Sequence, residues 1–274
     1  MSTQTVGVKA TERRAGRPGI ADRRLWRYGG RWLVPVAILL LWQALHMILG
    51  AADVAAPGRT GVVLADYLGE WWPDLIVTVR SLAISFAVAA GIGVVGGFLL
   101  GLSEFWYRVV SPLLVVAYAV PKIVLYPVIL MALGLSEEAR IVFSLIHGVF
   151  PIMLLTATAT TTIPQIRLRV ADSYRLSLAQ RLRLVVLPSI APTVVASLRI
   201  GFGACFLGLI LAEMFAAYNG LGFLITGYAV DSTTERLLAL VLLITLLAFL
   251  VTYTIRLWEE GRARRLGLTN VIAG

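Results

Sequence analysis

Six long apolar blocks constrain this chain more than any other feature of its sequence. They cover approximately residues 32–49, 75–101, 110–133, 141–163, 191–216 and 237–257. A helix needs about 20 apolar residues to cross the hydrocarbon core of a bilayer, and the six blocks are of this order. Transmembrane strands would be short runs of alternating polarity, a pattern that the chain lacks. We therefore expect an all-α integral membrane protein with six transmembrane helices.

The charged residues predict how these helices are oriented. The formal net charge is +9, and most of the 24 basic residues precede the first block or follow the second, fourth and sixth. The opposite connections hold mostly acids, among them Asp53, Asp74, Glu137 and Glu235. Because basic residues favour the cytoplasmic side, we expect both termini and the polar loop 164–190 to be cytoplasmic. Membrane orientation accounts for where most of the basic residues lie, so the positive net charge gives little reason to predict nucleic-acid binding.

Three regions follow from this pattern. We expect a cytoplasmic basic segment at 1–31, a six-helix transmembrane domain at 32–257 and a cytoplasmic tail at 258–274. The run Val34–Leu49 could be mistaken for a signal peptide, but a polar region of about 30 residues is long for an n-region, so we expect no cleavage. The single cysteine, Cys205, falls inside the fifth block, so no intrachain disulfide can form.

Small residues follow one another at intervals of four in the second block: Ser81, Ser85, Ala89, Gly93, Gly97 and Gly101. On a helix they form a narrow stripe along which another backbone can approach closely. We favour packing within the chain over a direct dimer seam. Three prolines, Pro121, Pro127 and Pro151, lie inside later blocks and are expected to kink them.

Ionisable residues at membrane depth mark candidate functional sites. Lys122 lies midway along the third block, His147 in the fourth and Glu213 towards the outer end of the fifth. These three residues are our candidates for the path of a solute, and Lys122 favours an anion. Alternatively, Lys122 pairs with Glu213 or with a freed carbonyl, or snorkels to the membrane surface. Arg199 is expected to be structural, and no second histidine stands at the spacing that a metal site requires.

The polar loop contains an amphipathic stretch, Arg167–Pro188. On a continuous helix it would place Ala171, Tyr174 and Leu178 on one face, together with Leu182 and Val185. Such a face could lie on lipid headgroups or fill a groove on a cytoplasmic partner. We expect Leu187–Pro188 to end the helix before the fifth block begins.

This stretch resembles the cytoplasmic loop of binding-protein-dependent ABC importer permeases. The family pattern is Glu-Ala-Ala, three residues, Gly, nine residues, an aliphatic residue, any residue and Leu-Pro. Arg169-Val170-Ala171 stands in the first three positions and Arg175 in that of glycine, while Val185 and Leu187-Pro188 match the end. Residues 75–103, 111–154 and 211–225 ("LAEMFAAYNGLGFLI") are similar to the nitrate, sulfonate, taurine and bicarbonate branch of these permeases.

The resemblance implies a mechanism. It implies a type I importer permease fold in a bacterial inner membrane, in which two permease copies form the path, two cytoplasmic ATPases drive it and an external binding protein delivers the solute. The loop would dock into the ATPase. Its expected contact residues are Ala171, Asp172, Tyr174, Arg175, Leu178, Leu187 and Pro188. Because arginine replaces the family glycine, we expect Arg175 to keep a negative φ and the helix to continue through it.

No nucleotide site or catalytic site is predicted on this chain. It has no G-x-x-x-x-G-K-[ST] phosphate loop, no H-E-x-x-H pattern and no nucleophile elbow. We therefore expect no cofactor here, with ATP and Mg²⁺ bound by the ATPase. A secondary transporter or channel is the alternative function. An intramembrane enzyme would require paired acids or a Ser/His constellation, which Glu213 and His147 do not supply. The solute itself is not readable from the sequence.

Overall fold

The computed structural model describes residues 20–50 and 53–265 of the 274-residue chain, and the side chains of residues 33–50 and 53–257. Residues 1–19 and 266–274 lie outside the described residues. They make up much of the predicted terminal segments 1–31 and 258–274. The chain divides into two compact units, Met1–Pro57 and Gly58–Gly274.

The first unit contains α1, Ile20–Leu49. Its apolar part, Leu33–Leu49, corresponds to the first predicted block. Gly50 follows with a φ of 92°, a conformation that glycine adopts without steric cost. The chain then turns back, so that the Trp42 indole nitrogen donates to the carbonyl of Ala55 at 3.0 Å.

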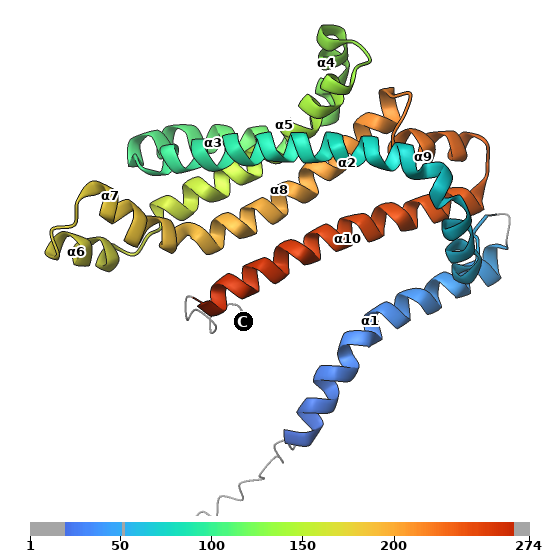
Figure 1. Cartoon of the computed structure of the whole chain (residues 1–274), viewed down its shortest axis with the longest axis horizontal. Helices are drawn as coiled ribbons and strands as arrows, with labels where there is room; N and C mark the ends of the chain where they lie inside the picture. The colour runs from blue at the N-terminus through green and yellow to red at the C-terminus, as the bar shows by residue number, and fades with distance from the viewer. Residues whose placement is uncertain (1–19, 51–52, 266–274) are drawn as a thin grey trace, which may run out of the picture. The chain divides into compact units, whose positions relative to one another are not determined.

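The second unit is helical throughout, apart from short connections (Figure 1). In chain order its elements are α2 (Pro57–Gly101), α3 (Glu104–Ala119), the 3-10 helix η1 (Lys122–Leu125), α4 (Tyr126–Leu133), α5 (Glu137–Thr161), α6 (Gln165–Ser173), α7 (Leu178–Arg181), the π-helical turn η2 (Leu182–Val186), α8 (Leu187–Ala216), α9 (Leu221–Val230) and α10 (Thr234–Arg265).

The prediction of an all-helical membrane protein is confirmed. Among the described residues, four helices are long and apolar enough to cross a membrane, namely Pro57–Gly101, Glu137–Thr161, Leu178–Ala216 and Thr234–Leu257. The bent pair of α3 with η1 and α4 makes a fifth if it is counted as one span. The apolar part of α1 is shorter, so a crossing by this first block stays a prediction.

The predicted third span, 110–133, is broken near its middle. α3 and the η1–α4 segment meet at an angle of 86°. Val120 has extended backbone angles (φ −62°, ψ 134°), as expected of a residue that precedes proline, and Pro121 has no N–H to continue the helix. Pro127 and Pro151 cause no such break. Pro127 falls in the first turn of α4, where the missing donor costs nothing, and Pro151 is accommodated inside α5.

The stripe of small residues on α2 packs against α5 of the same chain. All six of its members are buried. A Cβ added to Gly93 would lie 2.7 Å from the Ile152 side chain, and one added to Gly97 would collide with the backbone oxygen of Met153. A Cβ on Gly101 would meet Thr160. The two backbones therefore approach as closely as glycine allows.

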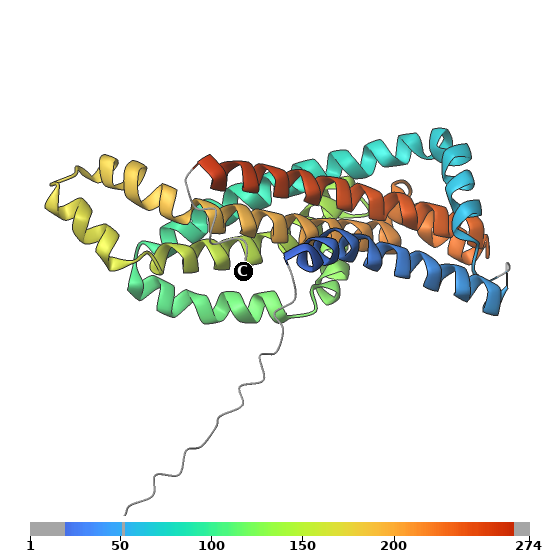
Figure 2. The ribbon, with the colours of Figure 1, turned by 90° about the horizontal axis from the view of Figure 1, so that it is seen from below.

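α5 also lies beside α8, and these two helices form the centre of the unit (Figures 1 and 2). Their shared core contains Ile152, Cys205 and Leu209, all fully buried. At one end of the pair, α6 and α7 form a small helical hairpin, and α9 lies at the opposite end (Figure 1). The predicted polar loop and α9 therefore lie at opposite ends of α8.

Candidate functional site

The polar loop is not the single helix that its amphipathic pattern predicted. α6 ends at Ser173, and α7 begins at Leu178. From Leu178 the helix then runs without interruption through η2 into α8, as far as Ala216. Leu187–Pro188 therefore does not end a helix, because Pro188 falls in the first turn of α8 and the preceding residues adopt a π-helical turn.

Arg175 makes the turn that separates α6 from α7, and its predicted negative φ is wrong. Its φ is 49°. The Arg175 N–H donates to the Asp172 carbonyl at 2.9 Å and the Leu176 N–H to the Ala171 carbonyl at 3.2 Å. These two bonds define a Schellman motif, in which glycine is the usual residue at the position that Arg175 occupies. The turn therefore forms with arginine in this position, at a cost of about 1–2 kcal/mol in steric strain.

A capping box begins α7 directly after this turn. The Ser177 N–H donates to Gln180 Oε1 at 2.9 Å, and the Gln180 N–H donates to Ser177 Oγ at 3.4 Å. Sequence reasoning missed these residues, although Ser-x-x-Gln is a recognisable start signal. Arg181 Nη1 then donates to Asp172 Oδ1 at 2.9 Å, which links α7 to α6. Together these contacts fix the hairpin and explain how it tolerates Arg175.

The predicted contact residues of the polar loop differ in exposure. Tyr174 is 77% exposed and Leu178 is 75% exposed, on either side of the turn. Ala171 is only 2% exposed, so its methyl group packs within the chain and cannot form the contact that we predicted for it. Asp172 and Arg175 are exposed beside Tyr174, and Leu187 is half exposed at the start of α8. Two bulky apolar side chains therefore face outward at the tip of the loop.

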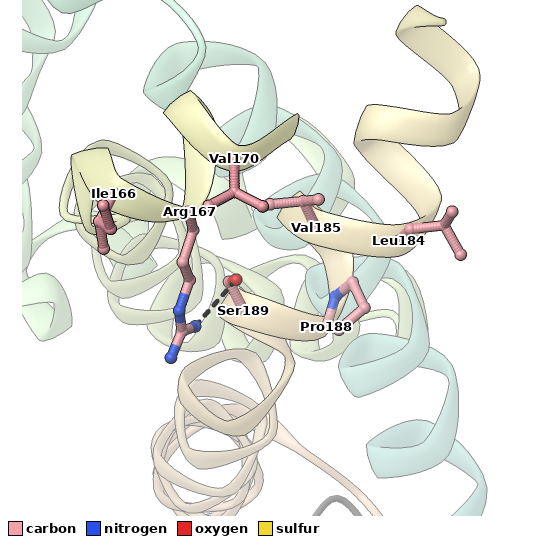
Figure 3. Close-up of a pocket in the computed structure, with 7 residues that line it drawn as sticks. All are labelled: Ile166, Arg167, Val170, Leu184, Val185, Pro188 and Ser189. Carbon is pink, nitrogen blue, oxygen red and sulfur yellow. Dashed lines mark hydrogen bonds between the residues drawn. The ribbon is translucent and has the colours of Figure 1, made fainter. Parts of the chain in front are cut away.

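A groove of about 400 Å³ runs along the base of the hairpin, between α6 and the start of α8. Figure 3 shows Val170 of α6 and Val185 of η2 pointing toward each other across it. Arg167 crosses the gap as well, and its Nη1 donates to Ser189 Oγ at 2.9 Å. The groove is otherwise apolar, lined also by Ile166, Leu184 and Pro188. The hydrogen bond between Arg167 and Ser189 connects α6 to α8.

Lys122 lies at the break between α3 and η1. Its side chain is buried, and Nζ donates to the Tyr118 carbonyl at 2.9 Å. That carbonyl is freed by the end of α3, so the pairing of Lys122 with a freed carbonyl is observed. The ammonium also lies 5.2 Å from the Tyr118 ring centroid and 5.8 Å from that of Phe150. Within the described chain, no carboxylate forms an ion pair with it.

His147 is one helical turn from Phe150 on α5, so it shares the face of α5 that meets Lys122. Its Nδ1 lies 2.9 Å from the Phe143 carbonyl, and its ring packs against Gly208 of α8. No group of three potential metal ligands occurs in the described part of the chain. His147 is therefore placed as a hydrogen-bonded residue between helices, near the Lys122 ammonium.

Glu213 forms hydrogen bonds within the protein. It is fully buried, and its carboxylate accepts from Thr78 Oγ1 at 2.9 and 3.0 Å and from the Gly222 N–H at 3.0 Å. Gly220, at φ 104°, passes so close that a Cβ would lie 2.5 Å from the carboxylate carbon. Its two hydrogen-bond partners thus lie on α2 and α9. Glu213 does not pair with Lys122.

The turn between α8 and α9 is also held by side chains of α2 and α5. Asp74 of α2 accepts from the Gly220 N–H at 2.6 Å, and Arg140 of α5 donates to both oxygens of Asn219 at 3.0 and 2.9 Å. Thr78 also accepts from the Leu221 N–H. The first N–H groups of α9 are thus capped by side chains from α2 and α8. Thr78, Asp74 and Arg140 carried no sequence signal for this role.

Comparison with known proteins places these features in a family. The family model for "Binding-protein-dependent transport system inner membrane component" matches residues 89–264, which contain the polar loop, Lys122 and the α8–α9 turn. The chain belongs to this family. It is therefore the membrane permease of a binding-protein-dependent transport system.

Two relatives illustrate the range of the family. The permease is 30% identical over 256 residues to CmpB, the bicarbonate transport system permease protein of Synechococcus elongatus, over 86% of this chain and 91% of CmpB. It is 24% identical over 242 residues to SsuC of Bacillus subtilis, which is named as an aliphatic sulfonates transport permease protein, over 85% of this chain and 87% of SsuC.

A solved structure supports the fold. The permease resembles a chain of the MetNI methionine ABC transporter in an inward-facing conformation, with a TM-score of 0.54 and 22% identity. The match covers 70% of the permease and 97% of that chain. The predicted ABC importer permease fold is confirmed.

Proposed function

We propose that two copies of this permease form the translocation path of an ATP-driven importer for a small anion. Two cytoplasmic ABC ATPases bind the polar loops, and an external binding protein delivers the solute. The chain has no phosphate-binding loop, so ATP and Mg²⁺ belong to the ATPase, and this subunit is not catalytic. The basic residues around the polar loop and both termini support a cytoplasmic position for all three.

The exposed tip of the polar loop carries the docking proposal. Tyr174 and Leu178 expose large apolar surfaces, which are costly in water and are typical anchors in the centre of protein interfaces. The Schellman turn and the capping box hold both side chains on a stiff hairpin. An aromatic anchor on a preorganised segment loses little conformational entropy when it binds.

The continuity of the helix suggests how the docking contact acts on the path. Leu178, inside the contact surface, begins the helix that ends at Ala216. A displacement of the hairpin by the ATPase is therefore transmitted along α8 as the movement of a rigid rod. At the far end, Glu213 ties this rod to α2 and to the start of α9.

Lys122 supports the proposal that the solute is an anion. A buried cation that has no carboxylate partner is costly at membrane depth, and a passing anion would compensate its charge. Two of the three N–H groups of Nζ remain for such an anion after the bond to Tyr118. Relatives are named for aliphatic sulfonates, taurine, nitrate and bicarbonate, each of which carries or forms an anionic group.

Reconstitution tests this function. The permease, its ATPase and its binding protein are placed in proteoliposomes, and uptake of labelled taurine, nitrate and bicarbonate is measured. We expect uptake of at least one anion that requires internal ATP, the ATPase and the binding protein, and that continues when ionophores collapse ion gradients. Uptake without the ATPase, driven by an ion gradient, would instead identify a secondary transporter.

A further inference from the structure

A second cavity, of about 540 Å³, lies at the root of the polar loop. Its walls come from the turn between α2 and α3, from the end of α5, from α6 and from α7 with η2. Arg108 and Arg181 are the basic residues of its lining, which also contains the polar residues Glu104, Tyr107, Thr160, Thr161 and Gln165 and, among its apolar residues, Leu102, Ile163 and Leu182. A hydrophobic floor beneath two guanidinium groups suits an amphiphile that carries an anionic headgroup.

Aromatic residues place this cavity at the level of the membrane surface. Phe105, Trp106 and Tyr107 follow one another at the start of α3, directly after the apolar run of α2 ends. Phe105 and Trp106 are more than half exposed, while the Tyr107 hydroxyl lies 3.2 Å from Thr158 Oγ1. Aromatic side chains gather at the boundary between headgroups and hydrocarbon. The cavity therefore opens where lipid headgroups lie.

The ion pairs that the two arginines form are weak enough for a bound phosphate group to replace them. Arg108 pairs with Glu104 one turn away, and Arg181 pairs with Asp172. All four side chains are at least 36% exposed, and exposed ion pairs of this kind contribute less than about 1 kcal/mol. A phosphate diester could displace either carboxylate, because the planar guanidinium fork matches phosphate oxygens as well. Glu104 also lines the cavity, and its negative charge disfavours the binding of an anion there.

We infer that this cavity binds the headgroup of an anionic phospholipid of the cytoplasmic leaflet. The phosphate lies between Arg108 and Arg181, and the acyl chains extend along the exposed apolar surface near Leu102 and Phe105. The inference rests on the orientation proposed above, since the cytoplasmic leaflet is the anionic one. A lipid held here connects the base of α3 to α7. Lipid composition would then tune the position of the docking hairpin.

Lipid retention by the full-length permease in detergent tests the inference. Mixed micelles with equal phosphatidylglycerol and phosphatidylcholine are exchanged away, and the lipid that remains is measured by native mass spectrometry. We expect preferential retention of phosphatidylglycerol by the wild type. Arg108→Gln and Arg181→Gln should each weaken it about fivefold. Glu104→Gln should strengthen it, which a variant that has merely lost its fold could not do.

Arg80→Gln is the matched control, because Arg80 is an exposed arginine that pairs with Glu137 at the other end of the unit. It should retain phosphatidylglycerol like the wild type. Equal retention of the two lipids, or an equal loss in Arg80→Gln, would overturn the site. Displacement of the lipid by millimolar inorganic phosphate would also overturn it, in favour of a free-anion site. No ATPase is present, so failure of the importer proposal does not affect this result.

Discussion

Glu213, near the end of α8, accepts hydrogen bonds from Thr78 of α2, a residue 135 positions earlier in the chain. The sequence placed Glu213 at membrane depth and suggested a contact with the solute. In the structure, the oxygens of its carboxylate accept hydrogen bonds from Thr78 and from the N–H of Gly222. The residue joins the end of α8 to the start of α9.

Removal of this carboxylate should destabilise the permease. Glu213→Ala leaves the Thr78 O–H and the Gly222 N–H buried without an acceptor, at a cost of at least about 2 kcal/mol. Glu235→Ala removes an exposed partner of Arg59 and should cost less than about 1 kcal/mol. Thermal unfolding in detergent compares the two. A Glu213→Gln variant with an unchanged melting temperature but no uptake would return Glu213 to the solute path.

The glycines of α2 should divide into two classes. Gly97→Ala would drive a Cβ into the Met153 carbonyl of α5, so we expect strong destabilisation or misassembly. Gly91→Ala, on the same helix, meets nothing within 4 Å and should stabilise the helix by about 0.5–1 kcal/mol. Melting temperatures of the two variants test this difference. Similar melting temperatures would mean that α2 and α5 are not in close contact.

Arg175→Gly should relieve strain in the polar loop. Glycine adopts the positive φ freely, and after its larger entropy loss on folding the net gain is about 0.5 kcal/mol. Arg169→Gly, inside α6, should instead weaken the helix by about 1 kcal/mol. Hydrogen exchange of the α6 amides reports both changes, slower in the first variant and faster in the second. Faster exchange in both would show that Arg175 makes contacts worth more than its strain.

Lys122→Ala should reduce anion uptake while assembly is retained. The cation would be lost from the break between α3 and η1, whereas Lys122→Arg keeps the charge and should retain part of the activity. Val124→Ala, an exposed position of the same η1 turn, is the control. Initial rates of ATP-driven uptake distinguish the three. Unchanged rates in Lys122→Ala would remove this residue from the path.

The sequence predicted those features of the fold that depend on apolar content and spacing. Long apolar blocks identified the helices, and residues at intervals of four, such as Gly93 and Gly97, identified the face of α2 that packs closely. The same information could not show which proline breaks a helix. Pro121 does so and Pro151 does not, because the result depends on whether neighbouring groups satisfy the freed carbonyls.

The site was less predictable, because local hydrogen bonds can force a residue into a backbone conformation that its type normally avoids. Arg175 was expected to avoid a positive φ, yet two Schellman bonds and the Ser177 capping box outweigh its strain. Ala171 shares a helical periodicity with Tyr174 and Leu178, but the turn after Ser173 ends that periodicity and leaves Ala171 buried. The partners of Glu213 come from α2 and α9, whose proximity no local pattern encodes.

Copurification with the ATPase tests the central claim most directly. Aspartate at Tyr174 and Leu178 would place charge in the proposed contact, and Tyr218→Asp is the matched control, because Tyr218 is similarly exposed at the opposite end. We expect Tyr174→Asp/Leu178→Asp to insert into the membrane normally and to lose the ATPase, while Tyr218→Asp retains it. Retention of the ATPase by the double variant at the wild-type level would contradict docking through the polar loop.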